Sequence, residues 1–525
     1  MQSIDKKNFF SHSFLFGIFL MAASLPFGNF MLSISDIILV LSWALEGNLR
    51  EKFNLFAKNK TALILSSLLV LHIIGLLYTT DLDYGFEDVQ RKLPLLLFPL
   101  MFSSSAPLSK KLFEKILSVF VLSVIVATLI CFSVLLGYTH TRQIPQPQQC
   151  SIFISHIRFG LLISLSVFIL GYFFVTQKQV AVKLISPLVI VWLISFMIMM
   201  ESATGLICTV VVSVFLLMWA IIRTRKNIAR VSLLALFLIA GGIATTVFYS
   251  VMKNLRQAPV IDQKQLLLVT KNGNPYVQDT LNKETENGNY VWLNVSETEL
   301  AEGWKKRSTM DYTGKDLQGN DLKYTLIRFL TSKGSAKDAE GINALSEEEV
   351  KAVEKGIPNI DFVGVFNPTS RIQKIIWEVG IYLKGGNPSG HSVIQRFEFW
   401  KAAVGIIKEN LWFGVGTGDI KNAFVLQYDK MNSPLTKEWR LRSHNQFLAI
   451  GTAFGIIGMG WFLITLFYPL IAERKFKDYF YLVFFIIAFL SFFTEDTIES
   501  QTGVTLFAFF NSFFLFLNKE TGVKN

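Results

Sequence analysis

The chain has 525 residues, of which 51% are hydrophobic and 14% aromatic, and 48 of them are phenylalanine. Charged residues make up only 17% of the chain, whereas a soluble protein usually contains about 25%. These values exclude a disordered, collagen-like, coiled-coil or disulfide-stabilised protein. Because apolar runs of about 20 residues recur along the sequence, they predict an all-α polytopic membrane protein.

Twelve apolar runs are predicted to cross the membrane. The first follows Lys6 and Lys7, and because no small-residue cleavage site comes after it, we expect an uncleaved span. The fourth run (LPLLLFPLMF) is short, which suits a kinked or partly re-entrant segment. The predicted spans are 13–28, 30–45, 61–78, 93–104, 112–137, 156–175, 184–200, 204–222, 232–250, 445–471, 479–493 and 503–518.

Basic residues between the runs predict the orientation. If the N-terminus is cytoplasmic, most Lys and Arg of the loops fall on the cytoplasmic side, as the positive-inside rule requires. The outer loops and span edges then keep only Arg91, Lys92, Arg142 and Arg158. This places both termini in the cytoplasm and predicts a multi-pass protein of a bacterial inner membrane. The net charge of +11 is spread among these loops and not gathered on one soluble face, so no nucleic-acid partner is expected.

The orientation divides the chain into three parts. Residues 1–250 carry spans one to nine, and residues 444–525 carry spans ten to twelve. Between them, residues 251–443 form a large periplasmic loop domain, with a membrane-surface helix near 396–410. Tryptophans and patterned apolar segments such as YTLIRFL (324–330) indicate that this domain is folded and not a linker.

Unusual residues gather just before the tenth span. Segment 394–410 places apolar side chains at helical spacing on one face, which predicts a helix at the membrane surface. Three glycines in FGVGTGD (413–419) allow a tight turn whose backbone N–H groups suit an anion nest. The segment RLRSHNQFL (440–448) then brings further polar residues to the mouth of the tenth span. The residues of the apolar face are Phe397, Trp400, Ala403, Val404 and Ile407, and the polar residues are Arg440, Arg442, His444 and Asn445.

This cluster allows two interpretations. Arginine forks suit phosphate recognition, and a neighbouring His that titrates near neutral pH can act as a base beside a bound anion. Alternatively, the Arg and His side chains only reach into lipid headgroups, and the glycines form an ordinary turn.

The same residues resemble the signature of the O-antigen ligase family, which belongs to the O-antigen ligase/polymerase superfamily. The resemblance rests on Arg396 and Trp400, on FGVGTGD, and on RSHNQFL followed by FGIIG (454–458). It covers about residues 390–460 by motif and the other spans by layout. The polar insert 251–390 resembles the corresponding loop of Bacteroidota-type members.

The resemblance implies a function in lipopolysaccharide biosynthesis. Members are integral-membrane glycosyltransferases that move a glycan from undecaprenyl pyrophosphate to an acceptor hydroxyl, commonly on lipid A–core, with inversion and without a metal or other cofactor. The implied partners are therefore this lipid-linked donor, a lipid or glycolipid acceptor, and membrane lipids.

The resemblance also assigns roles to residues. His444 matches the catalytic base of the family. Ala203 stands where many members carry an Arg, so that Arg442 or Arg142 would supply that charge. The implied catalytic residues are His444 and Arg396, the pyrophosphate-binding residues are Arg158, Arg442 and Arg396, and the supporting residues are Asn445, Trp400 and Gly416.

Other carboxylates and other functions stay open at this point. Asp81 and Asp83 are interpreted as a short acidic loop in preference to a metal site, and the acidic run 495–499 as a solvated outer patch. The nearest alternative function is an O-antigen polymerase, which uses the same donor. A secondary transporter and a glycan-binding scaffold without catalysis are alternatives from other classes.

Overall fold

The computed structural model describes residues 6–138, 147–224, 266–282, 284–363 and 388–518, with isolated positions between 227 and 246 and between 375 and 382. It is mostly helical and forms two compact units. The first unit comprises Met1–Ser133, Ser151–Phe215 and Ile375–Asn525, and the second comprises Val134–Cys150 and Leu216–Lys374. Residues 394–443 therefore belong to the same unit as the apolar helices.

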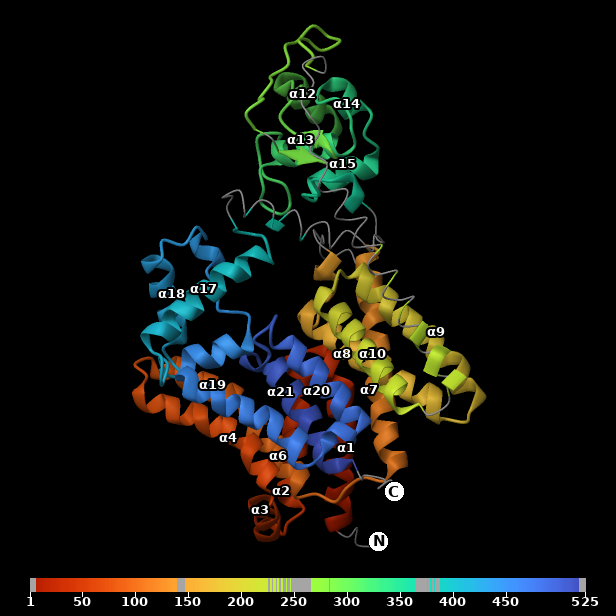
Figure 1. The fold of residues 1–525 in the computed structure, drawn as a ribbon, viewed down its shortest axis with the longest axis vertical. Helices are drawn as coiled ribbons and strands as arrows, with labels where there is room; N and C mark the ends of the chain where they lie inside the picture. Colours follow the sequence, from red (N-terminus) through yellow and green to blue (C-terminus); the bar gives the residue numbers. More distant parts are fainter. Residues whose placement is uncertain are drawn as a thin grey trace. The chain divides into compact units, whose positions relative to one another are not determined.

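Apolar helices form most of the first unit, and shorter helices pack among them (Figure 1). In chain order they are α1 (Lys6–Ser24), α2 (Asn29–Leu45), α3 (Leu49–Lys58), α4 (Lys60–Gly75), α5 (Leu82–Arg91), α6 (Pro94–Ser103), α7 (Lys110–Leu135), α8 (His156–Thr176), α9 (Val180–Met199), α10 (Ala203–Arg223), α17 (Ile394–Glu409), α18 (Ile420–Lys430), α19 (Gln446–Ala472), α20 (Tyr479–Ser491), η8 (Thr497–Glu499) and α21 (Gln501–Ser512).

Seven helices are long and apolar enough to cross a membrane, or eight if α2 and α3, which meet at a bend of 109°, form one span. A protein with several membrane-spanning helices is thereby confirmed. Helices α6, α20 and α21 coincide with predicted runs but are shorter. The ten residues of α6 cover about 15 Å, roughly half of the hydrocarbon thickness. The predicted run 232–250 lies mostly outside the described residues, and the count of twelve stays a prediction.

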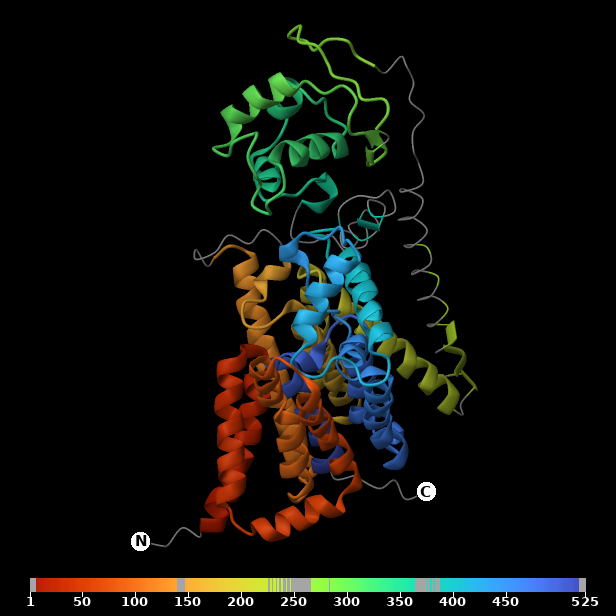
Figure 2. The ribbon, with the colours of Figure 1, turned by 90° about the vertical axis from the view of Figure 1, so that its left-hand side faces the viewer.

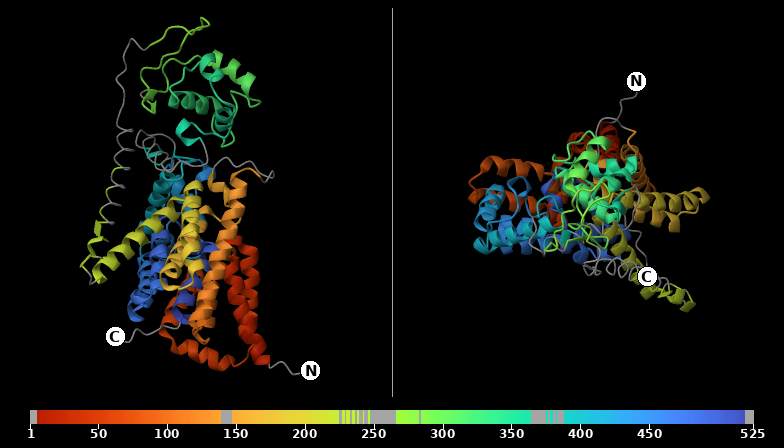
Figure 3. Two further views of the ribbon diagram at one scale, coloured as in Figure 1. Left: turned by 90° about the vertical axis from the view of Figure 1, so that its right-hand side faces the viewer. Right: turned by 90° about the horizontal axis from the view of Figure 1, so that it is seen from above.

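Close approaches between helices build the first unit. Helices α1 and α2 form an antiparallel pair (Figure 2). Helices α8 and α10 meet near their N-terminal ends (Figure 3), where Gly160 approaches Gly205 so closely that a Cβ on Gly205 would lie 2.8 Å from the Cα of Gly160. Small residues of this kind allow membrane helices to pack backbone to backbone.

The second unit contains a small folded domain with its own hydrophobic core. Trp304 is fully buried in this core, and its indole N–H donates to the Met310 carbonyl at 3.0 Å. The predicted segment YTLIRFL lies in α13, whose buried face contributes Leu326, Phe329 and Leu330. The elements of this domain (Figure 1) are β1 (Thr285–Glu286), β2 (Asn289–Tyr290), α12 (Glu297–Arg307), α13 (Leu322–Ser332), α14 (Ala339–Asn343) and α15 (Glu347–Glu354).

Helix α19 is broken at Gly455, where φ is 63° and ψ is −162°. The loop before α18 fills the break: Val415 N–H donates to the Thr452 carbonyl at 2.9 Å, and Ile456 N–H donates to the Leu411 carbonyl at 2.9 Å. The broken helix thereby regains partners for backbone groups that cannot stay unpaired in an apolar environment. We call residues 411–416 together with Gly455 the glycine clasp.

Replacing Gly455 with Ala is expected to lower the thermal stability of the purified protein. A Cβ on Gly455 would lie 2.4 Å from the Trp412 carbonyl carbon, and φ is positive there, a conformation that costs about 1–3 kcal/mol without glycine. Gly460→Ala is the matched control on the same helix, because a Cβ added at Gly460 would have no atom within 4 Å. Equal melting temperatures for the two variants would contradict the proposed contribution of the glycine clasp to stability.

Candidate active site

The segment between α20 and α21 forms the floor of the candidate site. Residues Glu495, Asp496 and Glu499 are buried, with exposed fractions of 4–5%. The prediction of a solvated acidic patch was therefore wrong. Buried carboxylates need paired charges or hydrogen bonds, and the residues around this segment supply both.

Two predicted arginines act on Glu495, Arg158 by direct contact and Arg396 electrostatically. Nη2 of Arg158, from the first turn of α8, lies 3.1 Å from Oε1 of Glu495. Arg396, from the first turn of α17, lies close enough to act electrostatically on the same carboxyl. Burial and the neighbouring Asp496 raise the pKa of Glu495 above its usual range, although His444 and the two arginines oppose the rise.

His444 lies above the two carboxylates and stays partly open to solvent, with 31% of its side chain exposed. Its Nδ1 is 3.8 Å from Oε2 of Glu495 and 3.6 Å from Oδ1 of Asp496. The ring also packs against Phe399, with centroids 5.7 Å apart. The backbone of His444 is left-handed, with φ of 44°, a strained conformation of the kind that gathers at functional sites.

Arg442 lies beside His444 at the opening of the cluster. Its guanidinium is 3.6 Å from Asp496 and 3.5 Å from Glu499, and 29% of the side chain is exposed. Burial opposes the charge, but the two carboxylates more than offset this and raise the pKa of Arg442. Nη1 also lies 3.4 Å from the Tyr84 hydroxyl of α5. Arg442 is thus a fixed cation with one accessible side.

Lys92 anchors the buried end of the cluster and was not among the predicted site residues. Its side chain has no exposed surface, and Nζ lies 2.6 Å from Asp88 and 2.8 Å from Glu499. Gln446 donates to Glu499 at 3.1 Å and accepts from the Ile498 N–H at 2.8 Å. Burial alone would raise the pKa of Glu499, but Lys92 and Arg442 bring it below the usual range.

Two predicted supporting residues hold the backbone around His444. The Trp400 indole N–H donates to the Ser443 carbonyl at 3.1 Å. Asn445 caps α19 by accepting from the Leu448 N–H at 3.0 Å, and its amide donates to the Phe493 carbonyl at 3.1 Å. These contacts tie the residues on either side of His444 to α17 and to the end of α20.

The predicted apolar face of α17 is shared between the protein interior and the surface. Ala403 and Ile407 are buried, whereas Phe397 and Val404 are each 40% exposed. Glu398 is buried although it is charged and lies outside the predicted apolar face. Its carboxylate pairs with Lys401 at 2.6 Å and accepts a hydrogen bond from the Tyr382 hydroxyl, and these contacts compensate its burial. Helix α17 packs against α19 and α18, and these contacts fix which of its residues are buried. The position of this helix at the membrane surface stays a prediction.

The prediction of an anion nest in 413–419 was wrong. The N–H of Gly416 donates to the Ala453 carbonyl at 2.9 Å, and the N–H of Gly418 donates to the Thr79 hydroxyl at 2.9 Å. These donors are therefore occupied by α19 and by the segment that follows α4. Gly416 supports the site through the fold, since its φ is 86° and a Cβ would lie 2.9 Å from the Gly75 carbonyl oxygen.

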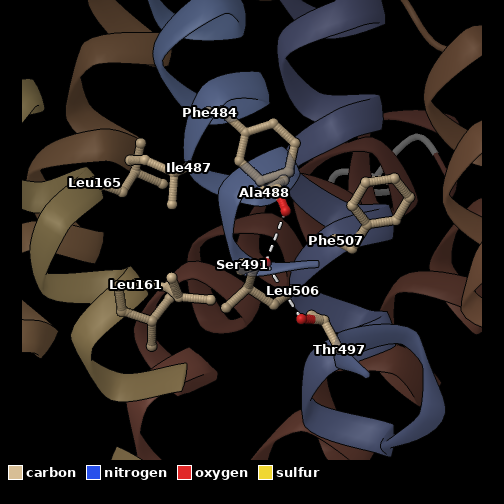
Figure 4. Close-up of a pocket in the computed structure, with 10 residues that line it drawn as sticks. Leu161, Leu165, Phe484, Ile487, Ala488, Ser491, Thr497, Leu506 and Phe507 are labelled. Carbon is tan, nitrogen blue, oxygen red and sulfur yellow. Dashed lines mark hydrogen bonds between the residues drawn. The ribbon is translucent and has the colours of Figure 1, made fainter. Parts of the chain in front are cut away.

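A small enclosed cavity of about 10 Å³ lies between α8, α20 and α21 (Figure 4). The walls are mainly apolar, and Ser491 and Thr497 place their hydroxyls 3.3 Å apart in it. This volume corresponds to about one water molecule. A sugar or a prenyl unit does not fit, so the cavity is part of the support for the acidic segment and not a substrate pocket.

The remaining predicted residues lie at the edge of the cluster or outside it. Asp81 caps α5 by accepting from the Tyr84 N–H at 3.0 Å, which favours the interpretation of a structural acidic loop. Ala203 begins α10 and brings no charge. Arg142 lies outside the described residues, whereas Arg442 lies in the cluster.

The carboxylates and His444 also form a set that could hold a metal ion. Within the described residues, one atom from each of His444, Glu495 and Asp496 lies within 4.8 Å of the others. Such a set fits a divalent cation by ligand type. The guanidinium of Arg442, 3.6 Å from Asp496, competes for the same negative charge.

Comparison with known families agrees with the motifs. Residues 360–463 match a family model described as O-antigen ligase. The matched range contains Arg396, Trp400, the loop of the glycine clasp and His444, whereas Arg158 and the acidic segment lie outside it. No curated protein matches the chain. This match agrees, over residues 360–463, with the resemblance to the O-antigen ligase family that the motifs indicated.

Proposed function

We propose that the protein is an inner-membrane glycosyltransferase of the O-antigen ligase type. It moves a glycan from undecaprenyl pyrophosphate to an acceptor hydroxyl on the periplasmic side, with lipid A–core or a similar glycolipid as acceptor. The observation that carries the proposal is the convergence of Arg158, Arg396, Arg442 and His444 on one buried acidic segment. A base can accept the proton of the attacking hydroxyl, while fixed cations stabilise the negative charge on the leaving pyrophosphate.

In the proposed reaction, the acceptor oxygen forms a bond to the anomeric carbon of the glycan while the bond from that carbon to the pyrophosphate oxygen breaks. Attack from the opposite side inverts the anomeric centre. The pyrophosphate leaves with the electron pair of the broken bond. The guanidinium groups of Arg158, Arg396 and Arg442 stabilise the charge that develops on it.

His444 accepts the proton of the attacking hydroxyl. General base catalysis of this kind contributes about 10²–10⁴-fold to a rate. Asp496 and Glu495 lie near Nδ1, so that Nε2 takes the proton and the carboxylates stabilise the resulting imidazolium, as in other His–carboxylate pairs.

Arg442 takes the role of the arginine that is missing at Ala203. Its partly exposed guanidinium is fixed by Asp496 and Glu499, which limits the entropy lost when it binds pyrophosphate. No metal is needed in this scheme, because the arginines supply the positive charge. If a metal instead occupies the set formed by His444, Glu495 and Asp496, transfer by the purified protein will be lost in EDTA and recovered with a divalent cation.

Arg442→Gln is expected to reduce transfer about 10²-fold or more, mainly through kcat. Arg440→Gln is the matched control, because Arg440 lies two residues away but pairs with Asp429 of α18 at 2.5 Å. The measurement is transfer of a radiolabelled glycan from undecaprenyl pyrophosphate to lipid A–core by the full-length protein in nanodiscs. Equal activities of the two variants would remove Arg442 from the proposed site.

A further inference from the structure

A second candidate site lies on the side of α17 that carries Trp400. Six residues line a shallow and largely open groove there, with a volume of about 470 Å³. All six belong to α17, and none of them is Arg396, which acts on Glu495. The lining residues are Phe397, Trp400, Lys401, Val404, Gly405 and Lys408.

The groove combines aromatic rings with basic groups. The rings of Phe397 and Trp400 are perpendicular, with centroids 5.8 Å apart, and Phe397 is 40% exposed. Lys401 is bound to Glu398, and Lys430 of the neighbouring helix is bound to Glu409. Lys408 is exposed and forms no ion pair with another described residue. Its charge is therefore available to an anionic ligand.

The groove is also connected to the candidate base. Trp400 lines it with its ring, while its indole N–H donates to the Ser443 carbonyl, directly before His444. At the opposite end, Gly405 faces the side chain of Gln427, and a Cβ there would lie 2.2 Å from the Gln427 amide nitrogen. The absence of a side chain at Gly405 thus lets α18 approach and shapes the groove.

We propose that this groove binds the phosphorylated saccharide of the acceptor, an inference that rests on the proposed function. Tyr382 stacks on Phe397, with ring centroids 6.3 Å apart, so that Trp400 and the remaining surface of Phe397 suit the apolar faces of sugar rings. Lys408 suits a phosphate. An acceptor held here presents its hydroxyl from the Trp400 side, while the donor pyrophosphate binds the arginines. The two substrates thus approach His444 from different sides.

The test measures binding separately from transfer. Full-length protein in nanodiscs of uncharged lipid is titrated with fluorescent, lipid-free core oligosaccharide, in phosphorylated and in dephosphorylated form. Lys408→Glu is expected to weaken binding of the phosphorylated form at least about tenfold and to leave the dephosphorylated form unchanged. Phe397→Ala is expected to weaken binding of both. Lys421→Glu, an equal charge change on the exposed side of α18, is expected to change neither.

Three outcomes would overturn the inference. Oligosaccharide that does not bind the unmodified protein would mean that another part of the chain or another ligand occupies the groove. Equal binding by the Lys408→Glu and Lys421→Glu variants would remove the phosphate contact. If Lys408→Glu changes only the affinity for vesicles that contain anionic lipids, the groove binds lipid headgroups. Since donor and turnover are absent from the titration, a failure of the proposed transfer reaction would leave this result interpretable.

Discussion

His444→Asn is expected to slow glycan transfer about 10²–10⁴-fold while donor binding and protein folding are retained. Asn is chosen because the backbone at His444 is left-handed, with φ of 44°, and Asn tolerates this conformation better than most residues. Asn has no group that accepts a proton near neutral pH, so the proton of the acceptor hydroxyl has no base. The arginines that bind the donor are unchanged.

The measurement is single-turnover transfer by the purified variant, together with retention of undecaprenyl-pyrophosphate-linked glycan. His12→Asn, at an exposed position of α1, controls for the loss of a histidine elsewhere. Normal transfer by His444→Asn at equal protein levels would contradict the role of His444 as base. Loss of both binding and transfer would assign His444 to donor binding instead.

Lys92→Met is expected to destabilise the protein by about 3–5 kcal/mol, an effect large enough to reduce its level in the membrane. Lys92 has no exposed side-chain surface, and its removal leaves the carboxylates of Asp88 and Glu499 buried without their shared cation. Met fills a similar volume, so the variant tests the charge and not the packing. Thermal unfolding of the purified protein measures the effect.

Lys110→Met is the control for this variant. Its pair with Glu114 is exposed, at 3.9 Å and with 59% of the lysine side chain open, and such a pair contributes about 0–1 kcal/mol. A second variant that carries both Lys92→Met and Asp88→Leu is expected to recover part of the lost stability, because one uncompensated charge is removed. Equal melting temperatures for Lys92→Met and Lys110→Met would show that the buried network does not hold the site together.

The structure brings together four polar residues that the sequence motifs and the family resemblance had singled out. Arg396, Arg442 and His444 lie within a short part of the chain, and the resemblance to a family pointed to Arg158 on a distant helix. The structure brings all four to the acidic segment 495–499. Their roles in catalysis stay predictions, and so do the Bacteroidota-type assignment and the orientation in the membrane.

The partners of these residues could not be predicted. Arg158 and Glu495 are separated by 337 positions, and an acidic run beside an apolar span is interpreted as solvated unless its basic partners are known. The role of Lys92 could not be predicted either, because only the tertiary fold shows that it lies between Asp88 and Glu499. Buried charges of this kind carry no local sequence pattern.

Two local sequence patterns predicted a turn and a helix correctly but did not predict the tertiary contacts that these elements make. The glycines of 413–419 predicted a tight turn, but their N–H groups pair with a broken helix that the sequence did not reveal. The periodicity of 394–410 predicted α17, yet its buried face includes Glu398, which Lys401 and Tyr382 compensate. In both cases tertiary contacts outweighed the local pattern.

The measurement that tests the proposed function most directly is the pool of undecaprenyl-linked glycan in a strain that lacks this protein, with the surface glycan analysed in parallel. Full-length polymer is expected on the carrier and none on the surface acceptor, with the same result when the strain carries the His444→Asn variant. Single repeat units on the carrier or acceptor would contradict it in favour of a polymerase. An unchanged pool would exclude transfer from this carrier and leave transport or scaffolding.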